Sequence, residues 1–361
     1  VVGRYGGDEF VILLYGTREA GLVEQTLDNL RASISAPLTV FDAALQIDAS
    51  MGVASYPQDG TDTETLLRNA DTALYRAKSE GRNRVRRFEP ALARASAERL
   101  SLAGRLRSAL QRQEFELFYQ PKVSVRANCV VGVEALLRWR DPCRGIVGPS
   151  EFVPHAEDSG LIVPIGEWVI DQACRQARQL FRGFPGLSVS VNVSPVQFAR
   201  TDLPETIARA VRCSGLRPEL LEIEITEGAL MDPSTLPLLH ALRKIGVCVA
   251  IDDFGVGYSS LAYIRSFMAD TLKIDMSFVR GIGQSPRDEA IVKAILGLGH
   301  TLGMKVVAEG VETVMQRDFL MQHGCDEIQG YLYARPVSGT DICEVITSLN
   351  ADMMSAHEVR G

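Results

Sequence analysis

Several polar residues that could carry chemistry lie at or next to the ends of short apolar runs. The runs are Val130–Val133, Val189–Val191, Leu221–Ile225, Val247–Ile251, Thr271–Ile274, Val306–Ala308 and Asp326–Ile328, and the polar residues are Glu134, Asn192, Glu224, Asp252, Asp253, Lys273, Glu309 and Gln329. Short apolar runs separated by helical stretches are typical of buried parallel strands. In a closed parallel barrel the C-terminal strand ends converge on one face. Carboxylates, amides and a lysine that meet there indicate a metal-dependent active site.

The kind of metal follows from the available ligands. The histidines are isolated and form neither an HxH nor an HExxH pattern, which argues against a histidine-based zinc site. Ligation by oxygen alone favours Mg²⁺ or Mn²⁺. Asp252-Asp253, followed by Phe254-Gly255-Val256-Gly257, is the sharpest local signal, because adjacent carboxylates can bridge two hard cations. The alternative is a helix N-terminus capped by Asp and Ser.

Three other features each allow a purely structural explanation. Glu222 and Glu224 alternate with isoleucines, so they belong either to a half-exposed strand or to the inner face of a barrel strand. Lys273 either extends to the surface or points inward toward carboxylate partners. Glu312 after Glu309 would simply favour a helix N-terminus.

Bulk composition limits the function classes. The 361 residues allow two domains, or one barrel with an appendage, and the net charge of −7 argues against a nucleic-acid polymer as partner. A phosphorylated small ligand is compatible with that charge, because a bound metal inverts the local field. The seven scattered cysteines predict reduced, mostly buried thiols and a cytoplasmic location. We expect no membrane span or signal peptide in this chain, and a longer parent protein, because it begins at Val1.

The first ninety residues predict a small α+β module. Val1–Tyr5 and Phe10–Tyr15 flank Gly6-Gly7 as a β-hairpin, followed by a helix near Ala20–Ser33. Strands near Leu45–Asp48 and Met51–Ser55 precede a helix over Thr63–Ser79, which Gly81 closes.

The rest of the chain predicts a barrel. Residues 91–112 are expected to form a linker helix, 113–350 a TIM-like (β/α)8 barrel, and 351–361 a tail. The expected helices are Ile165–Phe181, Leu203–Ser214, Leu236–Ile245, Leu261–Phe267, Glu289–Leu302 and Val314–His323.

These residues resemble the motifs of the EAL-domain cyclic di-GMP phosphodiesterases. The matching segments begin with Glu134-Ala135-Leu136-Leu137-Arg138-Trp139 and continue, in order, with Asn192-Val193-Ser194, Glu224-Ile225-Thr226-Glu227, Asp252-Asp253-Phe254-Gly255, Lys273-Ile274-Asp275, Ala308-Glu309-Gly310-Val311-Glu312 and Gln329-Gly330-Tyr331. The resemblance covers roughly residues 98–350. Residues 1–90 resemble the C-terminal half of a GGDEF domain, with Gly6-Gly7-Asp8-Glu9-Phe10 intact, and as printed this piece is expected not to make cyclic di-GMP.

The resemblance implies hydrolysis of cyclic di-GMP to linear pGpG with two Mg²⁺ or Mn²⁺ ions, and inhibition by Ca²⁺. It implies one metal held by Glu134, Asn192, Glu224 and Asp252, and a second held by Asp253 and Glu309 with Asp252 bridging. Lys273 would orient the attacking water, Glu309 would be a candidate general base, and Gln329 would support the water. Substrate contacts would come from Gln120, Leu136, Arg138, Asn192, Asp275 and Glu312.

The resemblance also implies regulation and rival functions. Glu227 would tether the glycine loop and couple contacts in a homodimer, formed through the EAL domain, to metal binding. Val256 departs from the threonine or alanine that the family often has, but it is no metal ligand, so we expect activity to survive. The alternatives are a catalytically silent cyclic di-GMP receptor and, in the full-length protein, a bifunctional cyclase and phosphodiesterase.

Overall fold

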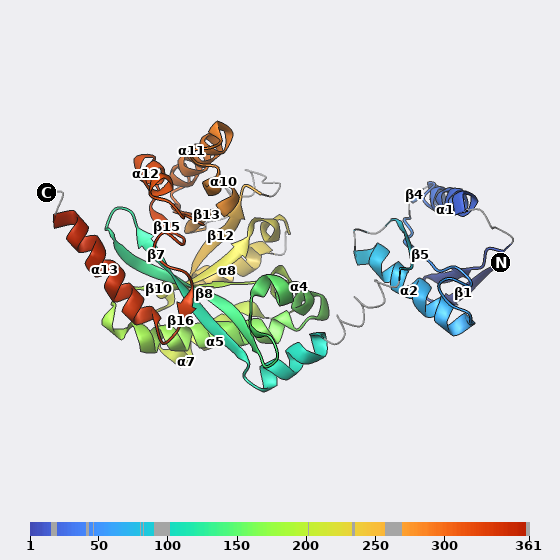
Figure 1. The fold of residues 1–361 in the computed structure, drawn as a ribbon, viewed down its shortest axis with the longest axis horizontal. Helices are drawn as coiled ribbons and strands as arrows, with labels where there is room; N and C mark the ends of the chain where they lie inside the picture. Colours follow the sequence, from blue (N-terminus) through green and yellow to red (C-terminus); the bar gives the residue numbers. More distant parts are fainter. Residues whose placement is uncertain are drawn as a thin grey trace. The chain divides into compact units, whose positions relative to one another are not determined.

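The computed structural model describes residues 1–15, 20–40, 43–45, 47–79, 81, 83–89, 102–200, 202–232, 235–256 and 269–358. The chain divides into two compact units, Val1–Ser101 and Leu102–Gly361, shown as ribbons in Figure 1. No helix in the described ranges is long and apolar enough to span a bilayer.

The first unit is a small α+β module, as the sequence predicts. Its elements are the antiparallel pair β1 (Val2–Gly6) and β2 (Glu9–Ile12), α1 (Ala20–Ile34), the antiparallel pair β3 (Leu38–Val40) and β4 (Ala43–Leu45), and the parallel pair β5 (Met51–Val53) and β6 (Val85–Arg87) with α2 (Thr63–Ser79). Helix α2 packs on β5 at Gly52, where a Cβ atom would come within 2.1 Å of the Ala70 carbonyl oxygen. The buried Ala73 and Ala77 continue this close contact.

The second unit is a closed barrel of eight strands. In order around the barrel these are β7 (Phe115–Ser124), β8 (Cys129–Asp141), β10 (Ser188–Asn192), β11 (Leu221–Thr226), β12 (Cys248–Phe254), β13 (Thr271–Ile274), β14 (Lys305–Ala308) and β15 (Glu327–Gln329), which pairs back with β7. Two short strands, β9 (Gly145–Val147) and β16 (Val337–Ser338), extend the sheet at β8 and β7.

Helices follow the strands and bury their apolar faces on the sheet. They include α4 (Pro149–Ser159), α5 (Ile162–Leu180), α6 (Pro195–Arg200), α7 (Leu203–Ser214), α8 (Thr235–Ile245), α10 (Met276–Arg280), α11 (Pro286–Thr301), α12 (Val314–Gln322) and α13 (Ile342–Glu358), with short 3₁₀ turns at Phe181–Gly183, Pro218–Leu220 and Glu227–Met231. The described helix at 102–111 packs Leu106 and Ala109 into the barrel core.

The structure corrects several expectations. The barrel is not wholly parallel, because β7 runs antiparallel to both neighbours, β8 and β15. The helix at 102–111 belongs to the barrel unit rather than to a linker, and residues 351–358 continue α13 rather than forming a tail. Helix α4 was not expected, and the predicted helix Leu261–Phe267 lies outside the described residues. The cysteines are all free, but only Cys174 and Cys325 are buried.

Candidate active site

Four carboxylates surround one buried lysine inside the barrel, and we call this cluster the acidic ring. Lys273 Nζ lies 2.6 Å from Glu224 Oε2, 2.6 Å from Glu309 Oε1, 3.1 Å from Asp252 Oδ1 and 3.9 Å from Glu134 Oε2. The lysine side chain is 1% exposed, so it is not a surface lysine. Of the two orientations that the sequence left open for Lys273 and Glu224, the structure shows the inward one.

Strand geometry brings these side chains together. Successive strand residues point to opposite faces, so Glu222 and Glu224 face the barrel interior while Ile223 and Ile225 are fully buried against the helices. Asn192 at the end of β10 pairs in register with Glu224. Glu134 does not end its strand as expected, because β8 continues to Asp141 in its long pairing with β7.

Amide side chains orient Glu134. Its Oε1 accepts a hydrogen bond from Asn192 Nδ2 at 2.6 Å, and its Oε2 accepts one from Gln329 Nε2 at 2.5 Å. Gln329 also donates to Gln120 Oε1 at 3.0 Å, and Gln120 donates to the Ala334 carbonyl oxygen. Both oxygens of Glu134 are thus fixed by residues predicted to belong to the site.

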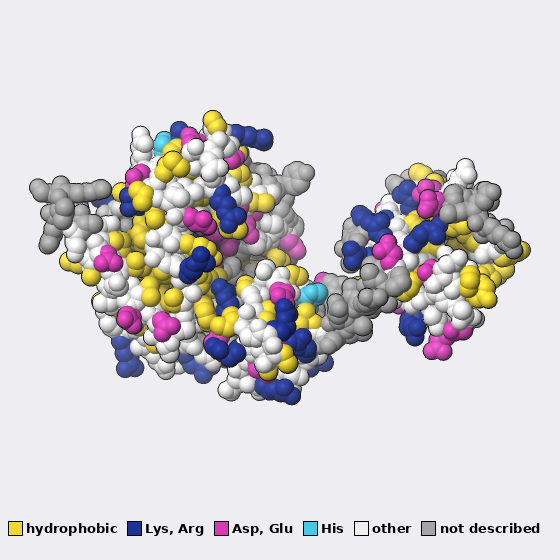
Figure 2. Space-filling view, viewed as in Figure 1, with side chains coloured by type: hydrophobic (Ala, Val, Ile, Leu, Met, Phe, Trp, Pro, Cys, Tyr) yellow, Lys and Arg dark blue, Asp and Glu magenta, His cyan; other side chains and the backbone are white. Residues whose placement is uncertain are grey.

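A second group of acids overlaps the ring, sharing Asp252 and Glu309 with it and adding Asp253. Carboxylate oxygens of Asp252, Asp253 and Glu309 all lie within 4.8 Å of one another. Asp253 adopts φ +53°, a left-handed conformation that is uncommon outside glycine. Figure 2 shows acidic side chains gathered in a recess on this face of the barrel unit, with lysine and arginine side chains around it.

Burial and mutual repulsion disturb the ionisation of these acids. Burial, reinforced by the charge of Glu134, raises the pKa of Glu224 well above its ordinary value. Burial also raises the pKa of Glu309 to about 8, against the opposing effect of Lys273. For Glu134 the attraction of Lys273 and the two amide hydrogen bonds outweigh burial, and its pKa falls. One ammonium group does not balance the negative charge collected here.

The donor set fits divalent cations that prefer oxygen. Glu224 Oε1 and Gln329 Oε1 are buried and have no hydrogen-bond partner among the described residues. An unpaired buried carboxylate oxygen is costly, and coordination to a cation would relieve that cost. The exposed oxygens of Asp253 and the carboxylates of Asp252 and Glu309 complete an all-oxygen set of the kind that Mg²⁺ and Mn²⁺ favour.

The glycine loop is attached to the 3₁₀ turn that follows β11. Gly255 N–H donates to Glu227 Oε2 at 3.0 Å, as the proposed tethering role of Glu227 requires. Gly255 has φ +99°, and a Cβ atom there would come within 2.8 Å of the Phe278 ring. Val256 is 64% exposed, while residues 257–260 of the loop lie outside the described ranges.

The predicted substrate contacts fall into two sets. Leu136 and Arg138 follow Glu134 on the same face of β8, and the Arg138 guanidinium lies 5.6 Å from the centre of the Phe118 ring. Asp275 instead caps helix α10 by accepting from Ser277 N–H. The Glu312 backbone N–H donates to Gln316, which forms a capping box with Thr313. The structural explanation offered for Glu312, at a helix N-terminus, is therefore supported.

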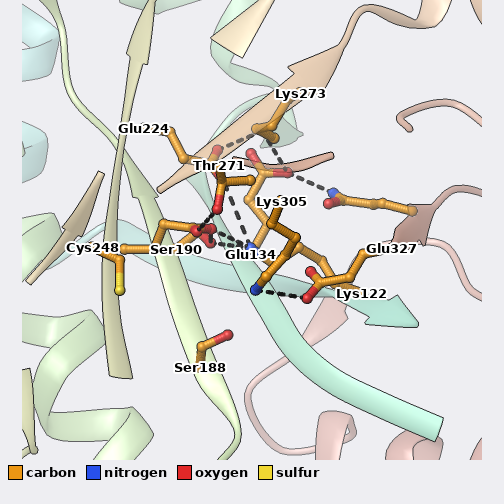
Figure 3. Close-up of polar contacts among 12 residues, drawn as sticks. Lys122, Glu134, Ser188, Ser190, Glu224, Cys248, Thr271, Lys273, Lys305 and Glu327 are labelled. Atoms are coloured by element: carbon orange, nitrogen blue, oxygen red, sulfur yellow. Dashed lines mark hydrogen bonds and ion pairs between the residues drawn. The ribbon is translucent and has the colours of Figure 1, made fainter. Parts of the chain in front are cut away.

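A second buried polar cluster lies below the acidic ring and was not predicted from the sequence. This lower layer consists of Lys122, Ser190, Glu222 and Thr271 (Figure 3). Each member is two residues along its strand from a site residue: Gln120, Asn192, Glu224 and Lys273 respectively. The period of two was the available signal, because alternate residues of a barrel strand point into the interior in successive layers.

Comparison with known proteins identifies two domain families along the chain. The EAL domain family matches residues 103–336, and the diguanylate cyclase GGDEF domain family matches residues 1–84. The chain is 43% identical over 339 residues to the bifunctional diguanylate cyclase/cyclic di-GMP phosphodiesterase MucR of Pseudomonas aeruginosa, covering 93% of this chain and 49% of MucR. It is 41% identical to the cyclic di-GMP phosphodiesterase NbdA of that organism, covering 93% and 43%.

Solved structures extend the likeness to three dimensions. The PaMucR phosphodiesterase in complex with c-di-GMP superposes with a TM-score of 0.65 at 44% identity, covering 67% of this chain and 99% of that one. The EAL enzyme Bd1971, bound to cAMP and cyclic di-GMP, gives a TM-score of 0.69 at 31% identity, covering 79% and 76%. This chain spans about half the length of the curated relatives described above. The chain belongs to the EAL domain family and carries part of a GGDEF domain before the barrel.

Proposed function

We propose that this chain is a metal-dependent phosphodiesterase that hydrolyses cyclic di-GMP to linear pGpG. The observation that carries this proposal is the acidic ring, in which four carboxylates, three of them buried, share one lysine. That excess of buried negative charge suits divalent cations better than any arrangement of protein groups alone. The relatives named as cyclic di-GMP phosphodiesterases, and the c-di-GMP complex of a 44% identical barrel, support the choice of substrate.

The residues suggest two cation positions that share Asp252. Glu134, Asn192, Glu224 and Asp252 would hold one ion, and Asp252, Asp253 and Glu309 the other. The two cations would supply an acidified water as nucleophile and would neutralise charge on the phosphoryl oxygens. The choice of Mg²⁺ or Mn²⁺ rests on the all-oxygen donor set.

The chain's own groups would position the reactants. Lys273 reaches three ring carboxylates at 3.1 Å or less, so its ammonium would orient the attacking water and offset growing negative charge. Glu309 would be a candidate general base toward the attacking water. Gln329 and Asn192 would keep Glu134 in a fixed orientation. Arg138 and Gln120 would line the phosphate and substrate groove.

A turnover assay tests the proposal. Purified chain, cyclic di-GMP and Mn²⁺ are incubated, and the products are separated by chromatography. Linear pGpG should accumulate, and Glu134→Ala should abolish it by removing a cation ligand. Glu344→Ala, an equivalent change at an exposed position of α13, is the matched control and should retain turnover. Tight binding of cyclic di-GMP without product would refute hydrolysis and identify a silent receptor.

A further inference from the structure

Lys122 connects the lower layer to the acidic ring. Its Nζ lies 2.5 Å from Glu222 Oε1, contacts Ser190 Oγ and lies 3.9 Å from Glu224 Oε1. The second oxygen of Glu222 accepts from the Thr271 hydroxyl at 2.7 Å. The lysine side chain is 2% exposed, so water does not compete for these contacts.

Glu224 consequently lies between two buried ammonium groups. Lys273 Nζ lies 2.6 Å from its Oε2, and Lys122 Nζ lies 3.9 Å from its other oxygen, Oε1. Glu224 Oε1 has no hydrogen-bond partner among the described residues. The attraction of Lys122 therefore acts on the oxygen that no hydrogen bond orients, and it opposes rotation of the carboxylate.

The backbone fixes Lys122 in turn. Gly132 of β8 pairs with Lys122 of β7 and with Ser188 of β10. A Cβ atom at Gly132 would come within 3.2 Å of Lys122 Cε and 2.4 Å of Ser188 Oγ. The absence of a side chain at this position thus leaves the space through which the lysine stem passes.

We propose that Lys122 is a positioning residue that holds Glu224 in the orientation needed for cation binding. The inference rests on the proposed metal-dependent function, but it concerns a residue outside the predicted ligand set. Lys122 pairs with Glu222, so the lower layer has no excess of negative charge with which to bind a cation itself. Lys122 approaches the proposed ligand set at Glu224, 3.9 Å away.

The attraction between partners keeps both groups of this pair charged. Burial alone would lower the pKa of Lys122, but Glu222 and Glu224 outweigh it and raise that pKa. Burial would raise the pKa of Glu222, yet Lys122, Ser190 and Thr271 together lower it to about 2. Replacing both partners by neutral residues of similar size therefore removes the charges without leaving either one unpaired.

The test compares stability with cation affinity in three variants of the full chain. Lys122→Met leaves Glu222 without its buried partner, whereas Lys122→Met/Glu222→Gln leaves no unpaired charge. Lys305→Met is the matched control, because it breaks a 2.8 Å ion pair with Glu327 that makes no contact with Glu224 in the described structure. Stability is measured by urea unfolding, and Mn²⁺ affinity by calorimetry or by the Mn²⁺ electron paramagnetic resonance signal without substrate.

We expect the double variant to regain stability but to bind Mn²⁺ about 10-fold or more weakly than the wild type, the effect typical of losing a residue that orients a ligand. Lys305→Met should bind Mn²⁺ like the wild type. Recovery of both stability and Mn²⁺ affinity in the double variant would show that the pair is merely structural and would overturn the inference. A wild-type chain that binds no Mn²⁺ would instead defeat the proposed function, and the inference with it.

If the charge variants do not fold, a variant that changes no charge tests the positioning role of Lys122. Ser190→Ala removes one contact of the Lys122 ammonium without changing any charge. It should weaken Mn²⁺ binding by a smaller factor than the double variant. Unchanged affinity in Ser190→Ala would then overturn the positioning role.

Discussion

The acidic ring and the lower layer occupy successive levels of the same barrel strands, yet they balance charge differently. In the lower layer Glu222 accepts hydrogen bonds from Lys122 and from the Ser190 and Thr271 hydroxyl groups, so both of its oxygens have donors. In the ring, Lys273 faces four carboxylates, and Glu224 Oε1 has no hydrogen-bond donor among the described residues. A buried cluster whose charges and hydrogen bonds are all paired within the protein indicates a structural role. A buried cluster with unpaired negative charge indicates a site for a bound cation.

The largest contrast should come from the same substitution at two positions of β11. Glu224→Gln should reduce Mn²⁺-dependent turnover by at least about 100-fold, because it removes a proposed ligand, and it should leave the free energy of unfolding without cations unchanged or higher. Glu222→Gln should lower that free energy by about 3 kcal/mol, because Lys122 loses its buried ionic partner. Turnover assays and urea unfolding are carried out on both variants. Equal losses of turnover and of unfolding free energy in the two variants would contradict the different roles assigned to Glu224 and Glu222.

Bound cations should raise the free energy of unfolding, and this gain should depend on the carboxylates of the acidic ring. Mn²⁺ at about 100 times its dissociation constant should add about 2.7 kcal/mol to the wild-type free energy of unfolding. Glu224→Gln should lose most of this gain, whereas Lys305→Met should keep it. Ca²⁺ should stabilise but inhibit turnover, because it accepts longer and looser coordination than Mg²⁺; undiminished hydrolysis with Ca²⁺ alone would count against the proposed sites.

The two layers should also respond to pH in different ranges. Burial raises the pKa of Glu309 to about 8, and a cation must displace that proton, so Mn²⁺ affinity should increase as the pH rises from 6 to 9. Glu222 has its pKa lowered from 4.5 to about 2, so its contribution to stability is present above pH 4.5 and is lost as the pH falls through about 2. Mn²⁺ titrations and acid unfolding measure these effects. A pH-independent Mn²⁺ affinity would contradict the first.

The smallest effect should come from crowding the lower layer without changing any charge. Gly132→Ala should lower the free energy of unfolding by about 1–3 kcal/mol, because its Cβ atom would press on Ser188 and Lys122. Gly297→Ala is the control: it lies in α11 with no heavy atom near the added Cβ, and it should raise stability by up to about 1 kcal/mol. Urea unfolding of both variants is sufficient, and equal effects would show that Gly132 is not a close contact.

Local patterns in the sequence predicted local structure well. Helix α2 spans Thr63–Ser79 and α7 spans Leu203–Ser214, as expected, because their apolar spacing ends at turn signals carried within the same segments. Most of the acidic ring was also predictable, since its carboxylates lie at or near the ends of short strands. Glu134 was the exception in position, because the length of β8 depends on its pairing with β7.

By itself, the sequence determined the family motifs, the polar residues of the ring and the two-residue period that points them inward. Only the tertiary structure decided that β7 closes the barrel antiparallel to both neighbours, and that Lys122 meets Glu222 a hundred residues further along the chain. Propensity and periodicity act over a few residues, whereas partners of buried charges are set by strand order and register around the closed barrel. The same amino-acid types therefore form a balanced layer at one level and a cation-binding candidate at the next.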